Sequence, residues 1–172
     1  MTYVALLHSI VLGEGRRLVM SDLKAIAAGL GLQNPRTLLA TGNLIFEAES
    51  QPLAQLESSL EKVFSEAKGK HVDIIIRTAP DWQKMAAGNP FPHPSDDQVC
   101  LRVMRKPLTD AGWHLIQEKA GDAEVRRING DLWIAFAGKP SDSRLLGHLT
   151  TKKLGIGTVR NWNTVRRISE SL

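Results

Sequence analysis

Six polar or aromatic side chains with rich hydrogen-bonding capacity lie close together at residues 157–165, in the segment GTVRNWNTV. Apolar residues there recur at spacings of three, three and four, which predicts a closing helix. Its buried stripe would consist of Trp162, Val165, Ile168 and Leu172. Asn161 or Asn163 would be the N-cap, and the helix start would direct free N–H groups and partial positive charge toward Arg160. This arrangement predicts a site for an anionic or polar ligand, although capping alone explains one asparagine.

Other recognisable chemistries find little support. The segment GEGRR lacks the spacing of a phosphate-binding P-loop, GIGTVR matches only two glycines of a dinucleotide-binding motif, and no nucleophile elbow occurs. The five histidines show no helical pairing and Cys100 is the single cysteine, so the sequence predicts no metal ion and no cofactor. Cys100 stands between two apolar residues and is expected to be a small core residue.

Composition points to a soluble, globular chain. The sequence has 172 residues, of which 42% are hydrophobic and 23% charged, enough for a sizeable core. A single cysteine excludes an internal disulfide framework. The sequence has no apolar run of about 18 residues, the length that a membrane-spanning helix needs. We therefore expect a cytoplasmic protein with no membrane partner, while the sequence leaves its oligomeric state open.

Charge is concentrated in the second half. Residues 1–90 carry nine Lys or Arg and nine Asp or Glu, whereas residues 91–172 carry thirteen and nine. Such an excess attracts anionic ligands or nucleic acid, and it is equally typical of a solvated helix face. The third strand of each predicted unit lacks the basic-glycine-aromatic start of an RNA-recognition module, so only weak electrostatic contact with nucleic acid remains open.

Hydrophobic periodicity predicts a strand, helix, strand, strand, helix, strand order in the first 77 residues. The predicted elements are a strand at 2–12, a helix between Ser21 and Gly31, strands at 36–40 and 44–48 around Thr41-Gly42-Asn43, a helix from Pro52 to Gly69 and a strand at 72–77. Asn34-Pro35 is expected to break the chain before the hairpin. Leu53, Leu56, Leu60, Val63 and Ala67 are expected to form the buried stripe of the second helix.

The same order recurs after residue 97. A helix from about residue 78 to Gly88 and the segment NPFPHP come first. They precede a strand at 99–104, a helix at 109–120, a hairpin of 124–128 with 132–136, a helix through Leu145 and Leu149, a strand at 157–160 and the last helix. Asn129-Gly130 is the strongest hairpin signal. The expectation is an α+β fold of two ferredoxin-like units with antiparallel sheets, at residues 1–77 and 98–172, joined by residues 78–97.

The chain also resembles a bacterial family of unknown function, the domain-of-unknown-function family 1697. The matching segments are YVALLHSIVLGEG from Tyr3, TGNLIF from Thr41, NPFP from Asn89 and TVRNWNTV from Thr158. They span nearly the whole chain, and the last is the most specific. The resemblance implies a paired ferredoxin-like fold and no established activity.

One loop departs from the family pattern. Where members have Arg-Gly, Asn and a second Gly after the first strand, this chain has His8-Ser9, Val11 and Glu14. If that loop holds a ligand in other members, this chain binds it weakly or binds another molecule. The motifs that begin at Thr41 and at Thr158 are intact, and the resemblance therefore places a shared site on Thr41, Gly42, Asn43, Arg160, Asn161 and Asn163. His8, in the altered loop, is a further candidate ligand-binding residue.

The resulting expectation is a binding module for a polar or anionic small molecule between two lobes. An enzyme is the alternative, with His8 and Glu14 as general acid or base. A module that contacts protein or nucleic acid through its basic second half is a third possibility.

Overall fold

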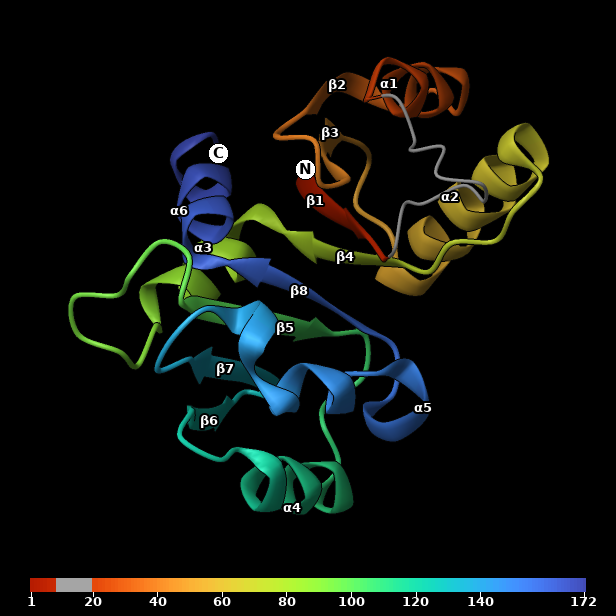
Figure 1. The fold of residues 1–172 in the computed structure, drawn as a ribbon. Coiled ribbons are helices and arrows are strands. Elements are labelled where there is room, and N and C mark those ends of the chain that lie inside the picture. The colour runs from red at the N-terminus through yellow and green to blue at the C-terminus, as the bar shows by residue number, and fades with distance from the viewer. Residues whose placement is uncertain (9–19) are drawn as a thin grey trace. The chain divides into compact units, whose positions relative to one another are not determined.

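The computed structural model describes residues 1–8 and 20–172 of the protein. The chain forms two compact units, residues 1–83 and residues 84–171, each built on a four-stranded antiparallel sheet (Figure 1). The division falls inside α3 (Ala79–Ala87), a helix that the sequence places in a linking segment. None of the described helices combines the length and apolar character needed to cross a membrane.

The first unit follows the predicted strand and helix order. Its elements are β1 (Thr2–Leu7), α1 (Met20–Gly29), β2 (Gln33–Thr37), β3 (Asn43–Glu47), α2 (Leu53–Lys68) and β4 (Ile74–Thr78). The sheet order is β2-β3-β1-β4, and each neighbouring pair is antiparallel. Since β1 is central and each helix connects strands that are not neighbours, the unit is ferredoxin-like, as predicted.

Helices α1 and α2 share one hydrophobic core with alternate residues of β1. That core includes Tyr3, Ala5, Leu7, Leu23, Leu60 and Phe64. The intervening residues of β1, Val4 and Leu6, are also buried. A strand buried on both faces explains why the first segment is apolar without alternation.

The edge strand β2 begins earlier than the sequence predicts. It includes Asn34-Pro35, which was expected to break the chain, and it ends at Thr37 rather than at residue 40. The register with β3 shifts between Gln33 and Arg36. A proline lacks the N–H of a ladder bond, so it is accepted at this irregular edge position.

The buried stripe of α2 also differs from the prediction. Val63 is only half-buried and Ala67 is exposed, whereas Glu57 and Phe64 are buried. Leucine spacing identifies an apolar stripe, but it does not account for a carboxylate that bonds to the sheet. The helix is therefore rotated toward β4 relative to the predicted stripe.

Two carboxylates of α2 complete the edge of the sheet. An Oε1 atom of Glu57 accepts a hydrogen bond from the N–H of Ile76 at 3.0 Å, and Oε1 of Glu61 accepts from the N–H of Ile74 at 2.8 Å. β4 is an edge strand, and its alternate N–H groups point away from β1. The two glutamates therefore satisfy donors that have no strand partner at the edge of the sheet, which also hinders pairing with another chain.

The second unit repeats the topology. Its elements are β5 (Val99–Met104), α4 (Asp110–Lys119), β6 (Glu124–Ile128), β7 (Asp131–Ala135), the short 3₁₀ helices η1 (Pro140–Asp142) and η2 (Arg144–His148), α5 (Thr151–Leu154), β8 (Gly157–Asn161) and α6 (Trp162–Glu170). The sheet order is β6-β7-β5-β8, again antiparallel throughout. Asn129 and Gly130 have φ of 52° and 87°, which confirms the predicted two-residue turn.

The helical turns in the connection between β7 and β8 are shorter than the single helix predicted there. The helix expected through Leu145 and Leu149 is a five-residue 3₁₀ helix that ends before Leu149. Ser143 caps it by accepting from the N–H of Leu145 at 3.2 Å. Leu145, Leu149 and Leu154 are all buried in the core of this unit, so short turns are enough to place all three leucines in it.

The two faces of the second sheet are covered by different elements. Helix α4 and the β7–β8 connection lie on one side, and α6 lies on the other (Figure 1). Trp133 of β7 points to the α6 side, where its ring centroid is 6.0 Å from that of Trp162. Arg160 is opposite Leu101 in β5 and thus belongs to the same face as α6.

Candidate ligand-binding site

The end of β1 is hydrogen-bonded to two segments of the first unit, one at Gly42 and one at Asp73. The N–H of Leu7 donates to the carbonyl of Gly42 at 2.9 Å, and the N–H of His8 donates to the carbonyl of Asp73 at 2.9 Å. His8 is partly buried. The structure therefore brings His8 and the Thr41-Gly42-Asn43 segment to one end of this sheet. Ser9, Val11 and Glu14, where the loop departs from the family pattern, lie outside the described residues.

Asn43 is fully buried and closes the connection between β2 and β3. Its Nδ2 donates to the carbonyl of Leu38 at 2.9 Å and to Oγ1 of Thr41 at 2.7 Å. Gly42 has φ of 74°, a conformation that favours glycine, and its carbonyl receives the bond from Leu7. These contacts give Asn43 a structural role, and only Thr41 of the three residues is exposed.

Arg160 is a buried cation in β8. Its side chain is 7% exposed, and Nη1 donates to Oγ1 of Thr158 at 2.7 Å and to the carbonyl of Val159 at 2.9 Å. Burial lowers the pKa of its guanidinium to about 10. The group therefore keeps its positive charge at neutral pH.

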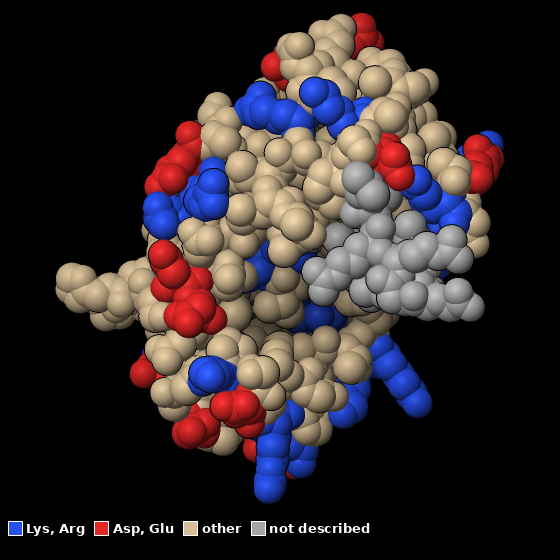
Figure 2. Space-filling view, turned by 45° about the horizontal axis from the view of Figure 1, so that its top comes forward, with Lys and Arg blue, Asp and Glu red and all other residues tan. Residues whose placement is uncertain are grey.

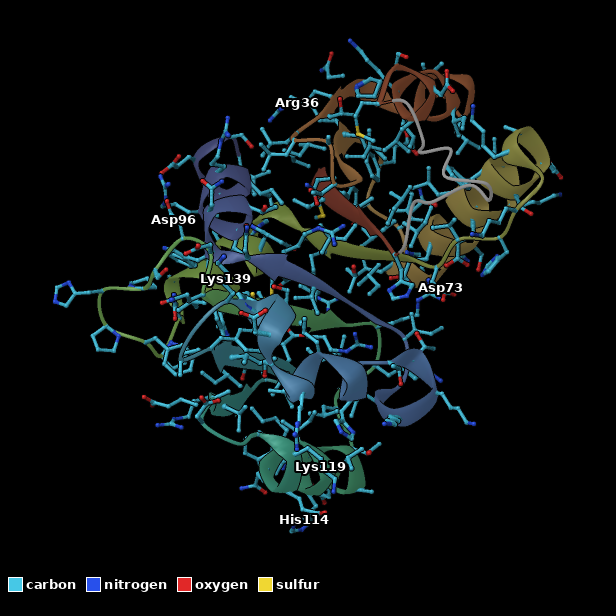
Figure 3. The ribbon with its side chains drawn as sticks, in the orientation of Figure 1. Arg36, Asp73, Asp96, His114, Lys119 and Lys139 are labelled. Carbon is cyan, nitrogen blue, oxygen red and sulfur yellow. The ribbon has the colours of Figure 1, made fainter. Side chains whose placement is uncertain are left out.

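Asn161 caps α6, which decides between the two predicted caps. Its Oδ1 accepts from the N–H of Thr164 at 3.0 Å and from Oγ1 of Thr164 at 2.8 Å. The N–H of Asn163 donates to the carbonyl of Asp96 at 3.1 Å, and Figure 3 shows Asp96 beside this helix. Two of the N–H groups that the sequence leaves for a ligand thus have protein acceptors.

Trp162 is half-buried, which corrects the predicted buried position. Val165 and Ile168 are fully buried, and Leu172 is only partly covered. Trp162 is the first residue of α6, so the helix does not cover its ring on every side. The tilted contact with Trp133, at an interplanar angle of 52°, accounts for the covered part.

The residues proposed from the resemblance divide into two groups. His8, Thr41, Gly42 and Asn43 belong to the first unit, and Arg160, Asn161 and Asn163 belong to the second. The first group ends the central strand of its sheet. The second joins the edge strand β8 to α6.

Arg102 is a buried residue that the sequence analysis missed. It is 1% exposed in the middle of β5, with Nη1 donating to the carbonyl of Leu149 at 3.1 Å and Nη2 to that of Gly155 at 3.0 Å. Burial lowers the pKa of this guanidinium to about 10. The one feature of the sequence that could have indicated a buried arginine is the position of this charged residue inside the apolar run VCLRVM.

Gly157 is the neighbour that admits the Arg102 side chain. A Cβ atom at Gly157 would lie 2.9 Å from Nε and 3.1 Å from Cζ of Arg102, and 2.7 Å from Sδ of Met104. The guanidinium therefore packs against a bare Cα. Arg102 joins β5 to the segment that leads into β8, and so it supports the strand that carries Arg160.

Cys100 is expected to resist thiol reagents in the folded protein. It is 5% exposed, and burial, with a smaller contribution from Asp97, raises the pKa of its thiol to about 11. The thiolate is the nucleophile, so alkylation by iodoacetamide at pH 8 should be slow in the native chain and fast in urea. Mass spectrometry of the two samples measures the difference. Equal labelling in both would contradict the buried position.

Comparisons with known proteins agree with this architecture. The family model described as a protein of unknown function, DUF1697, matches residues 1–133, and the chain belongs to that family. A solved structure described as a conserved bacterial protein, SP0830 from Streptococcus pneumoniae, is similar with a TM-score of 0.74. The two are 18% identical, and the similarity covers 98% of this chain and 97% of the other. The comparison with curated proteins gave no match.

These similarities bear on the fold. The solved structure has low sequence identity and supports only the arrangement of helices and strands. The family model and the solved structure both carry descriptions without an activity. The function therefore has to be inferred from the residues of this chain.

Proposed function

We propose that this protein is a binding module for a small polar or anionic molecule, held in the second unit by Arg160. The single observation that carries the proposal is a guanidinium that is 7% exposed at the end of an edge strand. A cation in such a setting interacts with an anion more strongly than one in water, because solvent screens it less. The expectation that the ligand lies between the two units stays a prediction.

The surroundings of Arg160 suit a small ligand. Asn161 and Asn163 are partly exposed and adjoin Arg160 in sequence, so the segment is accessible from solvent. The planar guanidinium has five N–H donors in a fork that fits carboxylate or phosphate, and its Nη1 also bonds to Thr158 and Val159. Because two N–H groups of α6 already bond to protein, the arginine side chain is the main anion-binding element of the proposal.

Charge elsewhere is mixed. Figure 2 shows Lys and Arg interspersed with Asp and Glu on the face it draws, which favours a local site over a broad electrostatic surface. The exposed cations of the C-terminal segment are Lys139, Arg144, Lys152, Lys153 and Arg167. Weak contact with nucleic acid through these exposed cations is a secondary proposal. We also propose a cytoplasmic location, which a single buried cysteine fits. The enzyme alternative pairs His8 with Glu14 and stays a prediction.

Substitution of Arg160 is the test. Arg160→Ala is expected to weaken binding of the anion by about 1.5–3 kcal/mol, the range of a charge-assisted hydrogen bond. Because the side chain is also buried and bonded to Thr158, the variant should be less stable as well. Affinity is therefore measured by calorimetry at a temperature where both proteins are folded. Inorganic phosphate, citrate, adenosine monophosphate and a short oligonucleotide serve as probes.

Arg167→Ala is the matched control, since it removes the same charge from an exposed position on α6. A local site predicts that Arg167→Ala binds the probe like the unsubstituted protein. Equal weakening in both variants would indicate a general charge effect. An unchanged affinity in Arg160→Ala would remove Arg160 from the site.

A further inference from the structure

One imidazole and two carboxylates cluster where α2 passes the start of β4. Glu61 lies on α2, and His71 and Asp73 lie in the segment that leads into β4, where Figure 3 labels Asp73. Each offers one ligand atom, and these atoms all lie within 4.8 Å of one another. Nε2 of His71 and Oδ1 of Asp73 are 3.1 Å apart.

We propose that Glu61, His71 and Asp73 bind a divalent transition-metal ion, with Zn²⁺ as the best fit. Zinc bonds to nitrogen and carboxylate oxygen at about 2.0–2.2 Å, so tetrahedral ligand atoms are separated by about 3.4 Å. The His71–Asp73 pair already has such a separation. The widest separation, which is within 4.8 Å, needs to close by at most about 1.4 Å, and the side chain of His71, which is 61% exposed, can turn to do so.

A backbone N–H group holds the Glu61 carboxylate in place, and a second hydrogen bond fixes the main chain at Asp73. The N–H of Ile74 donates to Oε1 of Glu61 at 2.8 Å, and the carbonyl of Asp73 accepts from the N–H of His8 at 2.9 Å. Hydrogen bonds of this kind orient metal ligands and reduce the side-chain entropy lost when an ion binds. The ion would therefore meet one carboxylate held by a backbone N–H, a second carboxylate on a fixed stretch of main chain, and an exposed imidazole.

The cluster opens onto a shallow groove along α2, which gives an ion access from solvent. Its lining is Ser58, Glu61, Lys62, Ser65, Glu66 and His71. Lys62 opposes a cation in this groove, whereas the carboxylates of Glu61, Asp73 and Glu66 favour one. Three protein ligands on an open groove leave a coordination position for water. Catalytic zinc sites have this pattern, whereas structural zinc sites have four protein ligands.

The ligand set selects among metals. An imidazole suits zinc and its transition-metal neighbours, whereas Mg²⁺ prefers oxygen ligands and retains its water. The sequence analysis found no metal site because it looked for histidine pairs on one helix. Here the ligands come from a helix and from the segment that precedes β4, and only the fold brings them together.

The test is a titration of the purified full-length chain after treatment with a chelator and buffer exchange. Calorimetry with Zn²⁺ should give one tight site, and Co²⁺ should give the visible absorption bands of a tetrahedral centre. His71→Ala removes an exposed ligand and should leave the fold intact while weakening Zn²⁺ binding at least about tenfold. Asp73→Asn should weaken it as well, and Mg²⁺ should bind poorly.

His114→Ala is the control, because His114 is an exposed histidine on α4 in the other unit. It should bind Zn²⁺ like the unsubstituted chain. Equal Zn²⁺ affinity in His71→Ala and in the unsubstituted protein would overturn the proposal, and so would the absence of a tight site. Circular dichroism of each variant verifies folding. The outcome is independent of Arg160, which lies in the second unit.

Discussion

Arg102→Ala is expected to lower the free energy of unfolding by about 3–5 kcal/mol, measured by urea denaturation followed by circular dichroism and tryptophan fluorescence. The side chain is 1% exposed and fills core space beneath Gly157. Alanine leaves a cavity and removes the donors for the carbonyls of Leu149 and Gly155. The β7–β8 connection should loosen first, because these two bonds hold it to β5.

An Arg102→Met variant separates packing from charge. Burial lowers the pKa of the guanidinium from its usual value to about 10, which corresponds to roughly 3 kcal/mol against the charged form. Methionine removes that cost and keeps most of the volume, but it leaves two carbonyls without their donors, at about 1–3 kcal/mol each. These terms nearly cancel, so the loss with methionine should be about 1–2 kcal/mol.

Arg126→Ala is the matched control in the same sheet. The Arg126 side chain is 55% exposed on the edge strand β6, and its Nη1 donates to the carbonyl of Val125 at 2.9 Å. Removing it should cost less than about 1 kcal/mol. If Arg102→Ala is no more destabilising than Arg126→Ala, the buried position of Arg102 is wrong.

Asn43→Ala is expected to cost about 2–4 kcal/mol in the same measurement, with the first unit affected. The amide is fully buried, and it donates at 2.9 Å to the carbonyl of Leu38 and at 2.7 Å to Oγ1 of Thr41. Alanine leaves the carbonyl without that donor in the connection between β2 and β3. This structural role is enough to explain why an asparagine follows Gly42, and no bound ligand is needed to explain it.

Thr41→Ala provides the comparison, because it removes one acceptor of the Asn43 amide at an exposed position. Its expected cost is about 0.5–1.5 kcal/mol. A stable Asn43→Ala variant that has lost affinity for an anionic probe would instead support the ligand role suggested by the family resemblance. Equal destabilisation in the two variants would also argue against the buried amide as the main contributor.

Local sequence patterns were sufficient to predict the order of elements in both units. Period-two and period-3.6 apolar patterns, and turn residues such as Asn129-Gly130, report on contacts between residues close in sequence. They predicted two ferredoxin-like units, the capped helix at the C-terminus and the buried Cys100. The same patterns could not predict how α2 rotates, since its buried Glu57 bonds to β4, an edge strand reached only after the helix ends.

The candidate sites depended more strongly on tertiary structure. The sequence selected Arg160 and its polar neighbours, but it did not indicate that Arg160 is buried or that Asp96 accepts from the N–H of Asn163. It also gave no indication that Glu61, His71 and Asp73 lie close together. Periodicity along the chain describes which face of an element is apolar. Only the packing of a helix beside a strand determines which polar atoms come within bonding distance, because those atoms belong to segments whose separation in sequence carries no pattern.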